Sequence, residues 1–262
     1  MGPDLRGAII GALGASRQER PRGDDPLEST SRPFMNLLAI DTSTGFCSVA
    51  ACRGETLFSR HEPAGQRQAE MILGMVDAVL AGAGLEIAQI EGIAYGAGPG
   101  SFTGLRIAAG VTQGLALARR VGVVGVGTLL ALAEEAAAET AGERIISCLD
   151  AHMGEVYHAA YRRAGAGWEE VSAPGLYKPE AVPVMADGEW AGCGDGFAAY
   201  RERLAARLGG CVSAVRSGTG PTARAVLRLA MPRFAAGEAM DAAAAVPVYL
   251  RDKVALKTSE RE

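Results

Sequence analysis

Aromatic residues make up only 5% of this 262-residue chain, and it holds three histidines, His61, His152 and His158. No two histidines are three or four residues apart, so they cannot form a pair of ligands on one helix face. The five cysteines include no Cys-x-x-Cys pair. Together these absences argue against a classical zinc site, and we expect no metal.

A basic excess is also missing, because the formal net charge is −4. This balance argues against a dedicated nucleic-acid-binding domain. No apolar stretch reaches the length of a membrane span, and Ala8–Leu13 is too short and lacks the basic start of a signal peptide. Unpaired cysteines in apolar segments are typical of buried thiols in a reducing compartment, so we expect a cytoplasmic protein with no membrane contact.

Residues 1–34 differ from the rest of the chain. The segment from Ser16 to Pro33 is rich in Arg, Asp, Ser and Pro and has almost no apolar residues. Such a composition cannot bury enough surface to fold, and we expect 1–34 to be a disordered extension. It is either a true tail or the product of an upstream start codon, and its removal should leave the melting temperature unchanged.

One pattern occurs twice after Met35. A buried strand ends in Asp41, and a glycine follows four residues later; the same design ends in Asp150 and Gly154. Each copy continues as a three-stranded meander followed by alternating helices and strands, which predicts a duplicated α/β fold with a cleft between two lobes. We expect lobes at 35–142 and 143–245 and a tail at 246–262. Asp41 and Asp150 would flank the cleft, or each would simply cap its own turn.

The segment Gly98–Arg106 leads from an apolar strand into a helix that we expect over 101–120. Ser101 can cap this helix by accepting from the N–H of Thr103 or Gly104, and the unpaired N–H groups of a helix start can hold an anion. The alternative is a tight turn without a ligand, since neither a P-loop nor Gly-x-Gly-x-x-Gly is present. The candidate phosphate-contacting residues are Asp41, Thr42, Ser43, Thr44, Gly98, Gly100 and Ser101. No catalytic nucleophile is supported, because no base can be proposed for Ser101.

Two helices of the first lobe, expected at 67–82 and 101–120, have wide apolar or small-residue faces. Surplus apolar width indicates an interface, whereas the alternative is burial against the chain's own sheet. The candidate interface residues are Ile72, Met75, Val76, Val79, Gly104, Ala108, Val111 and Leu115. Among these, we expect Met75, Val79 and Val111 to face outward.

Five segments, in the right order over about residues 36–258, resemble the TsaB (YeaZ) family. They are Leu38–Thr44, Ala94–Arg106, Gln113–Ala116, Asp150–Tyr157 and Pro247–Arg251. Gln68 is a departure from the family pattern, since many relatives have histidine at this position. The difference puts in doubt the local capping of the first helix or its contact with a partner.

The resemblance implies a duplicated actin/Hsp70-like ATPase fold (the ASKHA fold). It implies a non-catalytic subunit in the biosynthesis of threonylcarbamoyladenosine at position 37 of tRNAs that read ANN codons. The expected partners are the metal-holding catalytic subunit TsaD, the ATPase TsaE in a ternary complex, and a second copy of the chain in isolation. The first two helices of the N-terminal half would dock TsaD, and tRNA would be contacted mainly through the complex.

Two other classes of function stay open. A small-molecule kinase of the same fold would need a catalytic carboxylate and an adenosine pocket, for which Gly192–Gly196 is the only candidate loop. A peptidase would need metal ligands or a triad, and the sequence supports neither.

Overall fold

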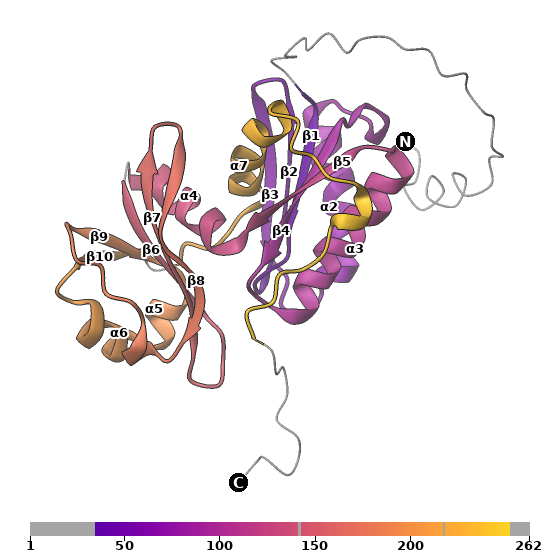
Figure 1. Cartoon of the computed structure of the whole chain (residues 1–262). Helices are drawn as coiled ribbons and strands as arrows, with labels where there is room; N and C mark the ends of the chain where they lie inside the picture. The colour runs from indigo at the N-terminus through magenta and orange to yellow at the C-terminus, as the bar shows by residue number, and fades with distance from the viewer. Residues whose placement is uncertain (1–34, 141–142, 217, 252–262) are drawn as a thin grey trace.

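The computed structural model describes residues 35–140, 143–216 and 218–251. They form two lobes, each built on a five-stranded sheet (Figure 1). The expected N-terminal extension, 1–34, and the last part of the expected tail, 252–262, lie outside the described residues. Within the described part, no helix is long and apolar enough to cross a membrane.

The first sheet has the order β3-β2-β1-β4-β5. Its first three strands form an antiparallel meander, and β4 and β5 then add in parallel beside β1. The strands are β1 (Leu37–Asp41), β2 (Phe46–Arg53), β3 (Thr56–Pro63), β4 (Gly92–Gly98) and β5 (Gly122–Gly127).

The second sheet repeats this design, since the order β10-β9-β6-β7-β8 is again a meander, with the parallel strands β9 and β10 added beside β6. The strands are β6 (Arg144–Asp150), β7 (Val156–Ala164), β8 (Gly167–Tyr177), β9 (Trp190–Cys193) and β10 (Val212–Arg216). The predicted duplication is therefore confirmed, and the fold is the expected actin/Hsp70-like one.

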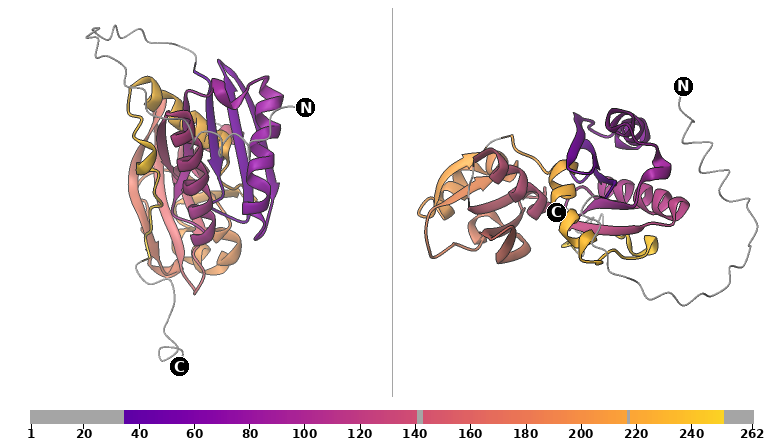
Figure 2. Two further views of the ribbon diagram at one scale, coloured as in Figure 1. Left: turned by 90° about the vertical axis from the view of Figure 1, so that its right-hand side faces the viewer. Right: turned by 90° about the horizontal axis from the view of Figure 1, so that it is seen from above.

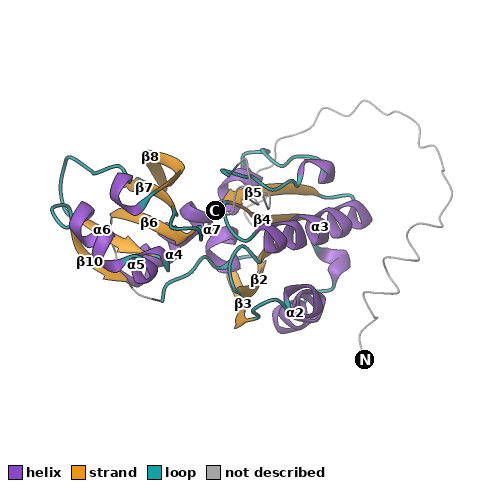
Figure 3. Cartoon of the chain, turned by 90° about the horizontal axis from the view of Figure 1, so that it is seen from below, coloured by secondary structure: helices purple, strands orange, loops and turns teal. Residues whose placement is uncertain are grey.

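Helices cover both faces of each sheet. In the first lobe, α2 (Gln68–Ala83) and α3 (Phe102–Arg119) lie on the face that is turned away from the second lobe, and α7 (Ala223–Ala235) lies on the opposite face (Figures 1 and 3). In the second lobe, α4 (Thr128–Thr140) covers one face, and α5 (Gly196–Ala199) with α6 (Arg201–Leu208) covers the other. Short 3-10 helices occur at η1 (Ile87–Gln89), η2 (Pro179–Ala181) and η3 (Ala242–Ala244).

The lobes exchange one helix each, which corrects the expected boundary at 142. Helix α4 follows the first sheet in sequence, yet its Leu129 and Leu132 pack on the second sheet. Helix α7 follows the second sheet, yet its Val226 and Phe234 pack on the first. The two crossings are reciprocal, since α7 covers the face of the first sheet that α4 leaves, and α4 covers the face of the second sheet that α7 leaves.

Local sequence accounts for most element bounds. Ser101 caps α3 by accepting from the N–H of Gly104, as predicted. The helical segment after β9 is divided into α5 and α6 at Tyr200, where the backbone leaves the helical region (φ −126°, ψ 39°). All five cysteines are reduced and buried, as expected.

Candidate functional site

A cleft of about 600 Å³ lies between the lobes. The first lobe contributes the turn after β1 and the start of α3, and the second contributes the turn after β6 and Asp195. The C-terminal segment adds Tyr249 and Arg251 to the lining. The described chain therefore forms this cleft from three parts that are far apart in sequence.

On the first-lobe side, two loops are clamped together. The N–H of Ser101 donates to the carbonyl of Ser43 at 2.7 Å, and Thr42 Oγ1 donates to the carbonyl of Gly104 at 2.7 Å. A Cβ at position 100 would lie 2.3 Å from the Ser43 oxygen, and one at position 104 would lie 1.8 Å from the Thr42 oxygen. Only glycine permits such a close backbone approach.

The structure separates the seven candidate phosphate-contacting residues into two groups. Four of them line the cleft: Ser43, Thr44, Gly100 and Ser101. Three do not: Asp41, Thr42 and Gly98. Thr42 is fully buried and uses its hydroxyl inside the lobe, and Gly98 lies under the carbonyl of Val248. The clustering of the four lining residues was predictable from the turn between strand and helix. Tertiary packing decides that the other three residues lie inside the lobe.

Asp41 does not flank the cleft, which was the first of the two placements predicted for it. Its carboxylate is 2% exposed, and Oδ1 accepts from both the N–H and the hydroxyl of Ser43, at 3.1 and 2.8 Å. Its Oδ2 lies over Gly96 and is a buried atom without a hydrogen-bond partner. Burial raises the pKa of Asp41 to about 6, although the bonds from Ser43 oppose this. The expected alternative, a carboxylate that caps its own turn, is therefore confirmed for Asp41.

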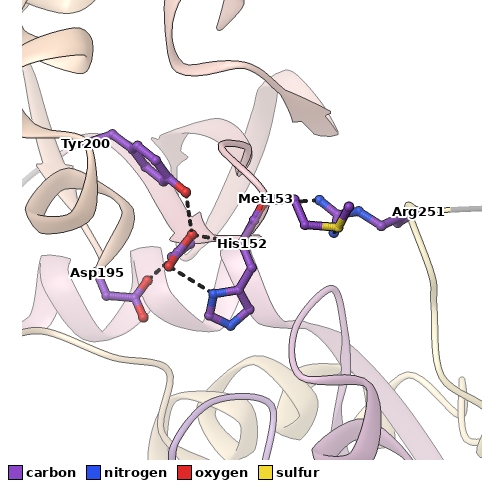
Figure 4. A network of polar contacts seen from close by, with 6 residues as sticks. His152, Met153, Asp195, Tyr200 and Arg251 are labelled. Atoms are coloured by element: carbon purple, nitrogen blue, oxygen red, sulfur yellow. Dashed lines mark hydrogen bonds and ion pairs between the residues drawn. The ribbon is translucent and has the colours of Figure 1, made fainter. Parts of the chain in front are cut away.

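On the second-lobe side, Asp150 lines the cleft as predicted. Its Oδ1 accepts from the N–H of His152 at 2.8 Å and from the hydroxyl of Tyr200 at 2.9 Å, and its Oδ2 lies 3.1 Å from His152 Nδ1. Figure 4 shows how His152, Tyr200 and Asp195 are gathered at this part of the cleft wall. The Asp150 carboxylate is thus held by its own turn and by the residue between α5 and α6.

A second carboxylate stands beside the first. Asp195 Oδ1 accepts from the N–H of Asp150 at 2.8 Å. Burial, and then the nearby charge of Asp150, raise the pKa of Asp195, although that hydrogen bond opposes the shift. This wall of the cleft is therefore acidic, and Arg251 reaches the adjacent turn from the C-terminal segment.

Tyr200 and Arg251 were not predicted as site residues. No local signal in the sequence distinguishes Tyr200. Arg251 belongs to a segment that carries the family resemblance, but its position suggested only a tail. Arg251 lines the cleft, and Tyr200 bonds to Asp150 in the cleft wall, both through contacts between segments that are distant in sequence.

The three histidines occupy different settings. His61 stacks on Phe46 with ring centroids 4.5 Å apart, and His152 is exposed at the cleft. His158 is completely buried, and burial lowers its pKa to about 4. Among the described residues, no group of three or more His, Cys, Asp or Glu side chains is placed to hold a metal ion.

The candidate interface stripe on α2 faces inward. Met75 is 4% exposed and Val79 is 3% exposed, and both pack with Ile72 and Val76 against the first sheet. The prediction that Met75 and Val79 face outward is therefore wrong, because the chain's own sheet takes up the apolar side of the helix.

On α3, Gly104, Ala108 and Leu115 are likewise buried. Val111 is half-buried at the edge of the same core. The outward side of the two helices carries small residues instead, notably Gly74, Gly110 and Gly114, where an added Cβ would meet nothing within 4 Å. Leu117, at 70% exposure, stands beside them.

Comparison with known proteins places the chain in one family. The family model described as TsaD, tRNA N6-adenosine threonylcarbamoyltransferase, matches residues 61–258. The tRNA threonylcarbamoyladenosine biosynthesis protein TsaB of Escherichia coli strain K12 is 37% identical over 227 residues, which are 85% of this chain and 97% of that protein. TsaB of Haemophilus influenzae is 34% identical over 85% of this chain and 96% of its own length.

A solved structure agrees with this relationship. YeaZ from Pseudomonas aeruginosa superimposes with a TM-score of 0.78 at 38% identity, and the match covers 82% of this chain and all of that one. Similarity of sequence and fold extends over nearly the full length of these relatives. The chain therefore belongs to the TsaB (YeaZ) family of tRNA threonylcarbamoyladenosine biosynthesis proteins.

Proposed function

We propose that this chain is a non-catalytic subunit that docks and supports TsaD during threonylcarbamoyl transfer to adenosine 37 of tRNAs reading ANN codons. TsaE joins the same complex, which works in the cytoplasm and contacts tRNA mainly through the other subunits. Family membership supports the pathway. The supporting, rather than catalytic, role is inferred from the cleft.

The burial of Asp41 carries this inference. A carboxylate that acts as a base or coordinates the metal ion bound to a phosphate must reach the substrate. Asp41 is turned away from the cleft and bonded to Ser43 of its own turn. This arrangement disfavours the small-molecule kinase alternative, because the first lobe presents hydroxyls and backbone groups to the cleft but no carboxylate at that position.

The docking surface that we propose is the outward face of α2 and α3, around Gly74, Gly110 and Gly114. Glycines four residues apart on a helix let another helix approach closely, and the exposed Leu117 supplies an apolar contact next to them. Of the residues expected to form the interface, only Val111 lies at the edge of this face. The buried stripe supports the face from beneath.

The same face would pair two copies of this chain when TsaD is absent. A surface that pairs with itself about a two-fold axis needs no second site. TsaD and a second copy would then compete for the face, so TsaD should dissociate the homodimer.

Substitution of Gly114 by Arg tests the proposal. The site is open in the monomer, so Gly114→Arg should fold normally but keep the partner helix away. Ala206→Arg, on the exposed surface of α6, is the matched control. Light-scattering mass with TsaD, together with threonylcarbamoyladenosine formation on tRNA, is the measurement.

We expect Gly114→Arg to lose the complex and most tRNA modification, while the control keeps both. Normal complex formation by Gly114→Arg would contradict the docking face. Modification of tRNA by the isolated wild-type chain, supplied with threonylcarbamoyl-AMP, would contradict the non-catalytic role.

A further inference from the structure

The C-terminal segment 245–251, here called the strap, includes the start of the tail expected at 246–262. It is anchored on the first lobe by three hydrogen bonds. The N–H of Val248 donates to the carbonyl of Ala97 at 2.7 Å, Tyr95 donates to the carbonyl of Val246 at 3.1 Å, and Gln113 donates to the carbonyl of Ala245 at 3.0 Å. Figures 1 and 2 show this yellow segment running along the first lobe.

The end of the strap belongs to the second lobe. Leu250 packs against the core between α4 and the second sheet. The Arg251 guanidinium donates to Glu155 Oε2 at 2.6 Å and to the carbonyl of His152 at 3.4 Å, and it meets Met153 Sδ at 3.3 Å. Its side chain is only 15% exposed. Arg251 therefore binds the turn 152–155, which lines the cleft (Figure 4).

Between these anchors, Tyr249 lies at the rim of the cleft. Its ring contacts Phe102 with centroids 5.4 Å apart. The Arg106 guanidinium lies over the Phe102 ring, 3.6 Å from its centroid, and 5.8 Å from the Tyr249 centroid. The strap thus contacts the start of α3 immediately before it crosses to the second lobe.

A separate contact joins the lobes elsewhere. Helices α4 and α7 pack against each other between the two sheets. Glu135 of α4 is buried there, where it accepts from Thr222 Oγ1 at 2.7 Å and pairs with Arg224. The chain enters each of these two helices from the other lobe, so the helix pair can act as a hinge. One hinge alone does not fix the angle between two lobes.

We propose that the strap is a clasp that fixes the angle between the lobes, with Arg251 as the positioning residue that holds the turn 152–155 in the cleft wall. The lobes are then joined at two places, the α4–α7 contact and the strap. The proposal concerns the isolated chain and stands independently of the proposed docking of TsaD.

The ion pair between Arg251 and Glu155 has the features of a strong interaction. Hydrogen bonds between charged groups of low exposure contribute more than exposed ion pairs, whose net effect is small. Removal of the guanidinium also leaves Glu155 without its partner. We therefore expect the turn to open at least about tenfold more often without Arg251.

Hydrogen exchange on the full chain tests the local part of this proposal. The N–H of Glu155 donates to the carbonyl of His152 at 3.1 Å, and the N–H of Ala151 donates to the carbonyl of Glu155 at 3.0 Å, so both amides report on the turn. Arg251→Ala should accelerate their exchange at least about tenfold. Arg162→Ala is the control, since Arg162 pairs with Glu169 at 2.7 Å within the β7–β8 hairpin.

Distances between the lobes test the global part. Spin labels on cysteines introduced at the exposed Ala81 of α2 and Ala206 of α6 report the lobe angle, and the native cysteines are buried. Arg251→Ala should broaden the distance distribution, and the control should not. The exchanged pair, Arg251→Glu with Glu155→Arg, should restore a narrow distribution.

An unchanged distribution and unchanged exchange in Arg251→Ala would overturn the proposal. Failure of the exchanged pair to restore the narrow distribution would also overturn it, because the link would then not depend on this ion pair. If Arg251→Ala unfolds the chain, Arg251→Met decides the question, since it keeps the apolar stem and removes only the charged group.

Discussion

The carboxyl group of Asp41 is enclosed by its own chain, and its ionisation there costs free energy. Two bonds from Ser43 stabilise the charge at Oδ1, but Oδ2 has no partner. Burial wins over the hydrogen bonds and raises the pKa from 3.8 to about 6. The folded chain therefore binds a proton at this site more tightly than the unfolded chain does.

This pKa shift predicts a pH dependence of stability. A raised pKa in the folded state stabilises the fold fully below the unfolded value, and that contribution is lost as pH rises through the folded value. Between about pH 4.5 and 7.5, the wild type should lose about 2 kcal/mol of unfolding free energy relative to Asp41→Asn. Urea denaturation of both proteins across this range measures the difference.

Asn is a suitable comparison because its side-chain oxygen can still accept both bonds from Ser43, while it carries no charge to bury. If the two stability curves run parallel with pH, Asp41 does not titrate in this range, and its burial is not the cause of any pH dependence seen in the wild type.

Helix α3 combines two kinds of glycine with opposite roles. Gly104 lies in the first turn, against the backbone of Thr42, whereas Gly110 lies on the outward side with open space around it. The first is needed to bring the helix onto the turn after β1, and thus shapes the cleft wall. The second lies on the proposed docking face, where the absence of a side chain lets a partner helix approach closely.

Alanine at these two positions should therefore have opposite effects. Gly110→Ala should stabilise the chain by about 0.5–1 kcal/mol, because glycine is a poor helix former and the new methyl group meets nothing. Gly104→Ala should destabilise it by more than about 2 kcal/mol, because its Cβ would lie 1.8 Å from a carbonyl oxygen. Thermal and chemical unfolding measure the stability of both variants. Equal changes at the two positions would contradict the opposite roles assigned to Gly104 and Gly110.

The exchange of α4 and α7 ties the lobes into one folding unit. On the first sheet, α7 buries Val226, Leu227 and Phe234 against β1 and its neighbours. Without α7, an entire apolar sheet face would be open to water, at a cost on the order of several kcal/mol. The lobes are therefore not independent domains, although each has its own sheet.

This exchange predicts the behaviour of fragments. Residues 35–142, the lobe expected from sequence, should not fold cooperatively alone, because α7 is missing and α4 lacks its sheet. A fragment in which 35–127 is joined by a flexible linker to 218–249 should fold. Circular dichroism and the sharpness of thermal unfolding compare the two; cooperative unfolding of 35–142 would mean that α7 is dispensable.

Much of this architecture could be predicted from sequence because the information is local. Strand ends marked by Asp41 and Asp150, each followed by a glycine four residues later, revealed the duplication, and both sheets contain the expected three-stranded meander. Ser101 marked the start of α3 through its capping side chain. The clustering of Ser43, Thr44, Gly100 and Ser101 followed from the turn between a strand and a helix, since neighbouring strand ends meet at one sheet edge.

Tertiary structure decided the rest, because it depends on contacts between distant segments. An apolar stripe shows which side of α2 avoids water, but not whether a sheet or a partner covers it; the chain's own sheet covers Met75 and Val79. Whether Asp41 faces the cleft depends on how β4 and Gly96 pack beside it. The crossing of α4 and α7, and the reach of Arg251 to Glu155, join segments whose pairing no local pattern encodes.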